Sequence, residues 1–273
     1  MRFARLAAAV TLAMHFGMVQ VATAQRTTPV KLVIPTYGQL DLVIDAWNHG
    51  LGKPFDFVCD APLADNFEQL ARVKVGTHCW TSPSFAHVQQ TADRAPKTIA
   101  CLNYDFEHWS HTPQAEQDDV VGTSRAIRAF CDQRHWRAAI GPMYRDALRL
   151  AKPLAPYYDI YLVQCQKYQK DERRAETVRY LREVADAVHG VNPKCLVGCQ
   201  LGTLDQYGDG TAGSGVKAAT ALYEQTKDFI QIYGVWWPPD GETLIKLLKA
   251  MDASPAKPAA AKPSPSPSRV IER

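Results

Sequence analysis

The feature that most constrains the fold is a regular alternation of short apolar runs with longer amphipathic stretches. The runs have about the length of a strand, and each is bounded by Gly, Pro or polar residues. They cover residues 30–35, 55–59, 75–80, 98–104, 138–143, 160–165, 195–199 and 230–237. Helix-like periodicity is clearest over residues 120–133, 144–151, 173–189 and 216–227, with a closing helix over 241–251.

Strands that alternate with helices pair in parallel, because each connection has to cross over the sheet. Repeating this unit around the whole chain predicts a single-domain (β/α)8 TIM barrel of the α/β class. An open doubly wound sheet is the alternative. No Gly-x-Gly-x-x-Gly follows the first apolar run, which argues against a dinucleotide-binding sheet.

Both ends of the chain read as segments outside this domain. Residues 1–24 begin with Arg2 and Arg5, continue with an apolar stretch, and end in Ala22-Thr23-Ala24, the pattern of a cleaved signal peptide. We therefore expect a secreted or periplasmic protein, with no membrane span after cleavage. Residues 252–273 are rich in Pro, Ala, Ser and Lys and predict a disordered tail, which leaves residues 25–251 for the barrel.

Charge and cysteine content narrow the chemistry further. Removing Arg2 and Arg5 from the 31 basic residues leaves 29 against 28 acidic ones, so a nucleic-acid partner is not expected. The 7 cysteines are an odd number and most lie in apolar runs, which favours buried thiols with at most one or two disulfides. His108 and His111 have no third ligand at a suitable spacing, so we predict neither a metal nor a cofactor.

Acidic residues cluster where the fourth strand of the predicted barrel ends. Asn103, Asp105 and Glu107 alternate with apolar residues, so they share one face, and that face should point into the barrel. Two carboxyls this close repel each other when both are ionised, which raises one pKa and creates a proton donor near neutral pH. The alternatives are a solvated pair at the strand end, or a pair satisfied by an arginine such as Arg145.

The residues from Asn103 to Glu107 resemble the end of the fourth-strand signature of chitinase-type glycoside hydrolases, the group of plant class III chitinases and chitinase-like lectins. Gln166-Lys167-Tyr168 is similar to the Gln-x-Tyr of the sixth strand, and Trp236-Trp237 stands where that family has a tryptophan under the sugar. The chain departs from the pattern at Ala100-Cys101, at Asn103, and in its third strand.

The resemblance implies an exported glycoside hydrolase that cleaves an oligo- or polysaccharide. Glu107 would protonate the glycosidic oxygen, Asp105 would orient the acetamido group of the substrate, and Tyr168 would steady the intermediate. The alternative is a catalytically silent, lectin-like or structural barrel at the cell surface.

Other residues at the predicted strand ends offer the aromatic faces and polar groups that carbohydrates require. The predicted substrate-binding residues are Asn103, Tyr37, Asp60, Trp80, Gln164, Gln166, Gln200, Trp236 and Trp237.

Overall fold

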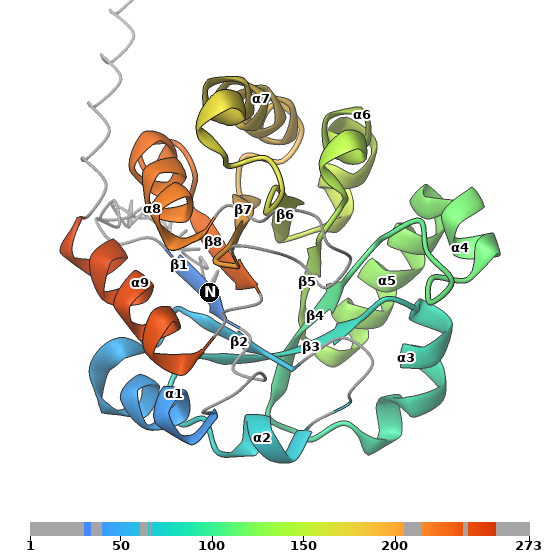
Figure 1. Ribbon diagram of the computed structural model, residues 1–273. Helices are drawn as coiled ribbons and strands as arrows, with labels where there is room; N and C mark the ends of the chain where they lie inside the picture. Colours follow the sequence, from blue (N-terminus) through green and yellow to red (C-terminus); the bar gives the residue numbers. More distant parts are fainter. Residues whose placement is uncertain are drawn as a thin grey trace, which may run out of the picture.

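The computed structural model describes residues 30–33, 40–60, 65, 67–204, 215–236 and 240–254. Its strands form a closed parallel barrel in sequence order, with helices around the outside (Figure 1). The strands are β1 (Val30–Val33), β2 (Phe57–Cys59), β3 (Thr77–Ser82), β4 (Ile99–Tyr104), β5 (Arg137–Ile140), β6 (Ile160–Gln164), β7 (Leu196–Gly202) and β8 (Ile232–Trp236). The predicted (β/α)8 barrel is confirmed, and the open sheet is excluded because β8 pairs with β1.

The helices follow the strands around the ring. They are α1 (Leu40–Ala46), α2 (Phe67–Ala71), α3 (Phe85–Thr91), α4 (Gln114–Asp118), α5 (Val120–Arg134), α6 (Tyr144–Leu154), α7 (Asp171–His189), α8 (Gly215–Thr226) and α9 (Gly241–Ala253). The long helices α5 to α9 agree with the sequence periodicity to within a few residues. The short helices of the first half carry too few turns for an apolar stripe to be recognised.

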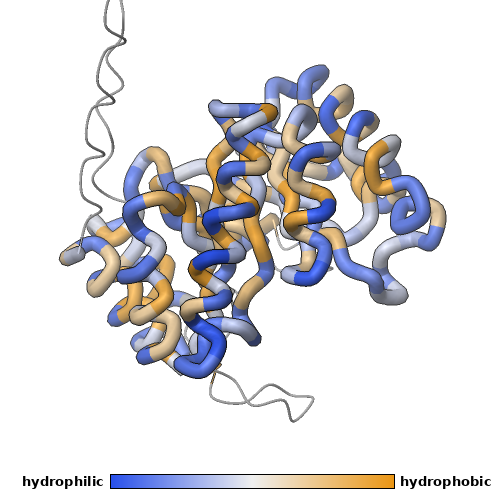
Figure 2. Tube along the Cα trace, turned by 90° about the horizontal axis from the view of Figure 1, so that it is seen from above, coloured by the Kyte–Doolittle hydropathy of each residue, from blue (hydrophilic) through white to orange (hydrophobic). Residues whose placement is uncertain are grey.

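Two apolar layers lie on the two sides of the sheet. Inside the barrel, residues such as Leu32, Phe57 and Leu162 form one cluster. Between the sheet and the helices lies a larger cluster that includes Leu102, Tyr104 and Phe106. Figure 2 shows the apolar segments running through the middle of the molecule, with hydrophilic segments spread over the helices and loops outside.

The cysteines are buried thiols and none of the 7 is in a disulfide. Three of them stand side by side inside the barrel, since Cys59 is in register with Cys79, and Cys79 with Cys101. A further pair, Cys165 and Cys199, belongs to the outer layer. The prediction of mainly buried thiols is therefore confirmed.

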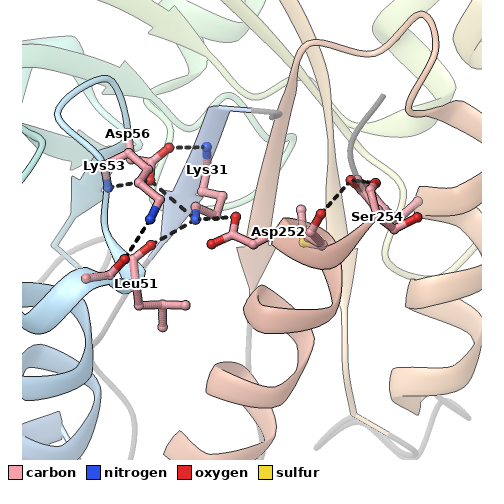
Figure 3. Close-up of polar contacts among 9 residues, drawn as sticks. Lys31, Leu51, Lys53, Asp56, Asp252 and Ser254 are labelled. Carbon is pink, nitrogen blue, oxygen red and sulfur yellow. Dashed lines mark hydrogen bonds and ion pairs between the residues drawn. The ribbon is translucent and has the colours of Figure 1, made fainter. Parts of the chain in front are cut away.

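A buried charge cluster lies between β1 and the surrounding helices at the N-terminal end of the barrel (Figure 3). Lys31 Nζ, which is fully buried, donates to Asp252 Oδ1 at 2.8 Å and to the Leu51 carbonyl oxygen at 2.9 Å. Asp56 accepts from the backbone N–H groups of Lys31 and Lys53, each at 2.9 Å, and lies 3.6 Å from Lys31 Nζ. The cluster joins β1 to the end of α9.

The end of the domain differs from the predicted boundary at residue 251. Helix α9 continues to Ala253, and the Ser254 carbonyl oxygen accepts from the Tyr223 hydroxyl at 2.7 Å. The prediction was short because Asp252 and Ala253 were read with the Pro-rich composition that follows, whereas the contact of Asp252 with Lys31 holds them in place. The predicted signal segment, residues 255–273, Tyr37 and Trp237 lie outside the described residues, as does the side chain of Trp236.

Among the helices that the structure describes, none is long and apolar enough to cross a membrane.

Candidate active site at the C-terminal end of the barrel

Asp105 is held at the C-terminal end of β4 by the packing on both sides of it. Its backbone N–H donates to the Ser82 carbonyl oxygen at 3.0 Å, which continues the pairing with β3. Tyr104 and Phe106 are buried in the outer layer, 1% exposed each, so the side chain of Asp105 between them turns into the barrel. The predicted alternation of polar and apolar faces along this segment is confirmed for residues 102–106.

The surroundings of Asp105 favour the protonated form of its carboxyl group. Only 2% of the residue is exposed, and among the described residues its carboxyl group accepts one hydrogen bond, from Gln164 Nε2 at 3.2 Å. Burial raises the pKa of Asp105 well above its ordinary value, and the negative charge of Glu107 raises it further. A carboxyl in this environment can keep its proton near neutral pH.

Glu107 is the more accessible member of the pair and is only partly buried. Burial raises its pKa, whereas a hydrogen bond with the Gln164 side chain and the positive charge of Lys167 lower it. The opposing effects leave Glu107 the more easily ionised carboxyl of the two. Arg145 takes no part, because its guanidinium lies 3.5 Å from Asp146 Oδ2.

Three glutamines surround the pair from β6 and β7. Gln164 Nε2 donates to Asp105 Oδ1 and, at 2.8 Å, to the Gly141 carbonyl oxygen. Gln166 Nε2 donates to Gln200 Oε1, which fixes the orientation of the Gln200 amide. Gln200 is 1% exposed, and its Nε2 donates to no group in the described part of the chain.

Gly141, directly after β5, lies next to Gln200 and Asp105. A Cβ atom at this position would lie 3.4 Å from Gln200 Nε2 and 3.5 Å from Asp105 Oδ1. An amide donor and a carboxyl oxygen therefore approach one point above bare backbone.

Asn103 lies two residues before Asp105 on the same face of β4 and is fully buried. Neither its Oδ1 nor its Nδ2 finds a hydrogen-bond partner among residues 30–33, 40–60, 65, 67–204, 215–236 and 240–254. A buried amide of this kind is costly, and natural proteins keep few of them. Asp60, the residue directly after β2, accepts through Oδ1 from the backbone N–H of Thr81 in β3 at 2.7 Å.

One of the predicted site residues, Trp80, faces away from the barrel interior. Trp80 is fully buried in the outer layer, where its ring contacts Phe67 edge to face and its Nε1 donates to Asp65. It was assigned to the site from its place at a strand end, but the alternation of β3 turns it toward the helices. Tyr168, in the segment between β6 and α7, stacks its ring on that of Tyr144, the first residue of α6, at 4.0 Å between centroids.

The structure therefore brings together Asp105, Glu107, Gln164, Gln166 and Gln200. Gly141 and Lys167 were missed by sequence reasoning. Gly141-Pro142 after a strand was a signal for Gly141, and Lys167 stood within the motif that was used for its neighbours.

No cluster of three or more His, Cys, Asp or Glu suited to a metal ion occurs in the described ranges. His108, which had been considered for metal binding, instead lies 3.3 Å from Asp146 Oδ2 and hydrogen-bonds Gln117 through Nδ1.

Comparison with known proteins finds similarity of structure alone. No family model matches the chain, and no curated protein matches it. A xylanase and alpha-amylase inhibitor protein from Scadoxus multiflorus is 10% identical, covering 83% of this chain and 98% of that chain, with a TM-score of 0.51. A tryptophan synthase structure from M. tuberculosis is 11% identical, covering 84% and 93%, with a TM-score of 0.48. A tryptophan synthase alpha-subunit from Pyrococcus furiosus is 7% identical, covering 84% and 97%, with a TM-score of 0.46.

These comparisons contradict the assignment to chitinase-type glycoside hydrolases. The structural neighbours are chiefly tryptophan synthase chains, together with the inhibitor protein, and no family model supports a hydrolase. The prediction was wrong because it depended on three short motifs, and acidic and aromatic residues occur at the strand ends of many unrelated barrels. Glycoside hydrolysis, lectin-like glycan binding and a polysaccharide partner are therefore withdrawn. Similarity at this level establishes the fold alone, so the function has to be argued from the site.

Proposed function

We propose that this chain is an acid–base enzyme, in which the Asp105–Glu107 pair moves a proton to or from a small organic molecule at the C-terminal end of the barrel. The observation that carries the proposal is the pair itself. Its two carboxyls differ in burial, the more buried one has its pKa raised well above the ordinary value, and the other is the more easily ionised. Carboxyls whose environments push their pKa values apart supply an acid and a base at the same pH.

The different burial of the two carboxyls assigns the roles of proton donor and base. Asp105, which is almost fully buried, is the carboxyl that favours its protonated form, and it acts as the donor. Glu107, which is partly exposed and lies near Lys167, is the base that meets the substrate first. This reverses the roles that the sequence motif implied, where Glu107 was the acid.

Position in the fold supports the proposal. In barrels of this type the reacting groups stand at the carboxyl ends of the strands, and the buried charges of the other end stabilise the fold. Asp105, Gln164 and Gln200 all come from the carboxyl ends of β4, β6 and β7, which are fixed by the closed sheet.

Proton exchange tests the proposal without a known substrate. The purified protein would be incubated in D2O with defined small hydroxy acids, ketones and amides, and exchange of carbon-bound hydrogen followed by NMR. Glu107→Gln should lower any catalysed exchange by about 10²–10⁴-fold, the usual effect of losing a general base. The matched control is Glu116→Gln, a buried carboxyl that caps α3 and should leave exchange unchanged.

Two results would count against the proposal. One is an absence of catalysed exchange with every compound, and the other is equal exchange by the wild type and Glu107→Gln.

We also propose that the mature protein is exported and begins at Gln25. The proposal rests on the signal-peptide pattern of residues 1–24, in which Arg2 and Arg5 precede an apolar stretch that ends in Ala22-Thr23-Ala24. N-terminal sequencing of the protein recovered from outside the cytoplasm tests this, and a chain that still starts at Met1 would refute it.

A further inference from the structure

His108 follows Glu107 directly and lies on the outer side of the segment after β4. Its ring contacts that of Phe106 edge to face, with 5.2 Å between the centroids, and Phe106 is buried in the outer layer. On the other side, the charge of Glu107 raises the pKa of Asp105, so these two carboxyls lie near each other. The alternation of β4 therefore continues to residue 108, with the carboxyls on one side and the rings on the other. Contacts that hold His108 outside also keep Glu107 inside.

One ring nitrogen of His108 is held by α4. Gln117 Nε2 donates to the Trp109 carbonyl oxygen at 3.0 Å and to the Thr112 carbonyl oxygen at 2.7 Å, and these two bonds fix the orientation of the amide. Its Oε1 then faces His108 Nδ1 at 3.1 Å. An amide oxygen only accepts, so His108 Nδ1 carries the hydrogen of this bond.

The other ring nitrogen faces a buried carboxylate on α6. His108 Nε2 lies 3.3 Å from Asp146 Oδ2, which is an ion pair when the ring is protonated. The Asp146 side chain is 11% exposed, and its other ion pairs among the described residues are with Arg149 at 2.8 Å and Arg145 at 3.5 Å. Within the same part of the chain Oδ2 accepts no hydrogen bond, so its contacts are ionic. His108 thus joins the segment that carries Glu107 to α6.

We propose that His108 is a positioning residue, whose contacts with α4 and α6 keep the Glu107 carboxyl turned toward Asp105. This deepens the acid–base function proposed above and rests on it. His108 acts through Glu107 and transfers no proton itself. When both contacts are lost, the buried ring of Phe106 is the remaining anchor of this segment, and Glu107 turns out toward solvent.

His108→Phe tests the proposal, because it removes both ring nitrogens and keeps a ring beside Phe106. Titration of 13C-labelled aspartate and glutamate carboxyls by NMR would follow the pair without a substrate. A Glu107 that turns outward loses the burial that raises its pKa, and Asp105 loses a neighbouring charge. The pKa values of both should therefore fall toward their ordinary values of 4.5 and 3.8.

The direction of this change separates positioning from a direct effect of charge. Loss of the positive charge of His108 alone would raise the pKa values of nearby carboxyls. The matched control is His49→Phe, because His49 also pairs with a carboxylate, that of Asp45, but lies in the segment after α1. It should leave both titrations unchanged.

Catalysed exchange gives a second readout, with the hydroxy acid, ketone or amide that the wild type exchanges fastest in D2O. His108→Phe should lower the rate at saturating substrate by about tenfold, the effect of one lost hydrogen bond. Asp146→Ala should lower it in the wild type and have little further effect in His108→Phe, because the two residues act through one contact. Thermal melting would show that each variant is folded.

The inference is overturned if His108→Phe leaves the two pKa values unchanged or raises them. It is also overturned if Asp146→Ala lowers exchange equally in the wild type and in His108→Phe. Its failure differs from failure of the acid–base function. Lowered pKa values in His108→Phe, without catalysed exchange of any compound by the wild type, would refute the function and leave His108 as the residue that orients Glu107. Catalysed exchange that is lost in Glu107→Gln but unchanged in His108→Phe would refute the role of His108 alone.

Discussion

The two ends of the barrel bury acidic groups in opposite ways. At the N-terminal end, Asp56 accepts two backbone N–H bonds and faces the ammonium group of Lys31, which also binds Asp252. At the C-terminal end, Asp105 has one hydrogen bond from a neutral amide among the described residues, and its neighbouring charge is another carboxylate. Burial raises the pKa of both Asp56 and Asp105, but only Asp56 has a cation and N–H donors that pull it back down. Under the proposed function, the N-terminal end stabilises the fold and the C-terminal end transfers protons.

Removing the cation from the N-terminal end should give the largest loss of stability. Lys31→Met leaves Asp56 and Asp252 without their shared ammonium group, and breaking a buried ion pair by removing one partner costs about 3–5 kcal/mol. Urea unfolding of the variant measures this loss. Lys53→Met is the matched control, because Lys53 holds Asp56 through its backbone N–H and its exposed Nζ binds only the Gly50 carbonyl oxygen among the described residues. Equal stability of Lys31→Met and the wild type would contradict the claim that the N-terminal charge cluster stabilises the fold.

The last residues of α9 belong to the same stabilising end. A chain that stops after Met251 loses the contact of Asp252 with Lys31 and should be less stable by about 1.5–3 kcal/mol, the scale of a hydrogen bond to a charged group. A chain that stops after Ser254 keeps that contact and should melt like the full protein. Two truncations with the same melting temperature would show that Asp252 contributes nothing.

Changing a carboxyl to an amide should reduce stability more at Glu116, which accepts several hydrogen bonds, than at Glu107 in the site. Glu116 accepts from Ser84 Oγ, the Phe85 and Ala86 N–H groups, and the Tyr104 hydroxyl, so Glu116→Gln should cost about 1–3 kcal/mol. Glu107→Gln removes a charge that raises the pKa of Asp105 and should leave stability unchanged or slightly higher. Denaturant midpoints of the two variants give the test, and a larger loss in Glu107→Gln would contradict it.

We expect the free energy of unfolding to decrease as the pH rises, because of Asp105. Because its folded-state pKa is raised above the ordinary value of 3.8, the folded state binds more protons than the unfolded state above about pH 4. Stability contributed by this group is complete at low pH and is lost as the pH rises toward the folded pKa, by up to about 1.4 kcal/mol per pH unit. Asp105→Asn keeps the acceptor for Gln164 and should flatten that decline in chemical unfolding between pH 4 and 8. Parallel curves for variant and wild type would show that Asp105 is not perturbed.

The sequence was sufficient for the barrel and for the inward face of β4, because both depend on periodicity that is local along the chain. It misplaced Trp80, because the predicted strand ended at residue 80, whereas β3 continues to Ser82 and Trp80 lies within it, on the face that packs against the helices. It missed Gly141, because the nearness of Gly141 to Gln200 and Asp105 joins residues from distant parts of the chain. It also ended the domain too early, because the partner of Asp252 is Lys31, 221 residues earlier.

The most direct test of the account is the protonation state of Asp105 itself. The protein would be labelled with 13C at aspartate carboxyls and titrated by NMR, with the Asp105 resonance assigned through Asp105→Asn. We expect the pKa of Asp105 to lie well above its ordinary value of 3.8, and to fall when Glu107 is replaced with Gln, because that change removes the neighbouring charge. An Asp105 carboxyl that titrates near the ordinary value of 3.8, whether or not Glu107 is present, would contradict the central claim.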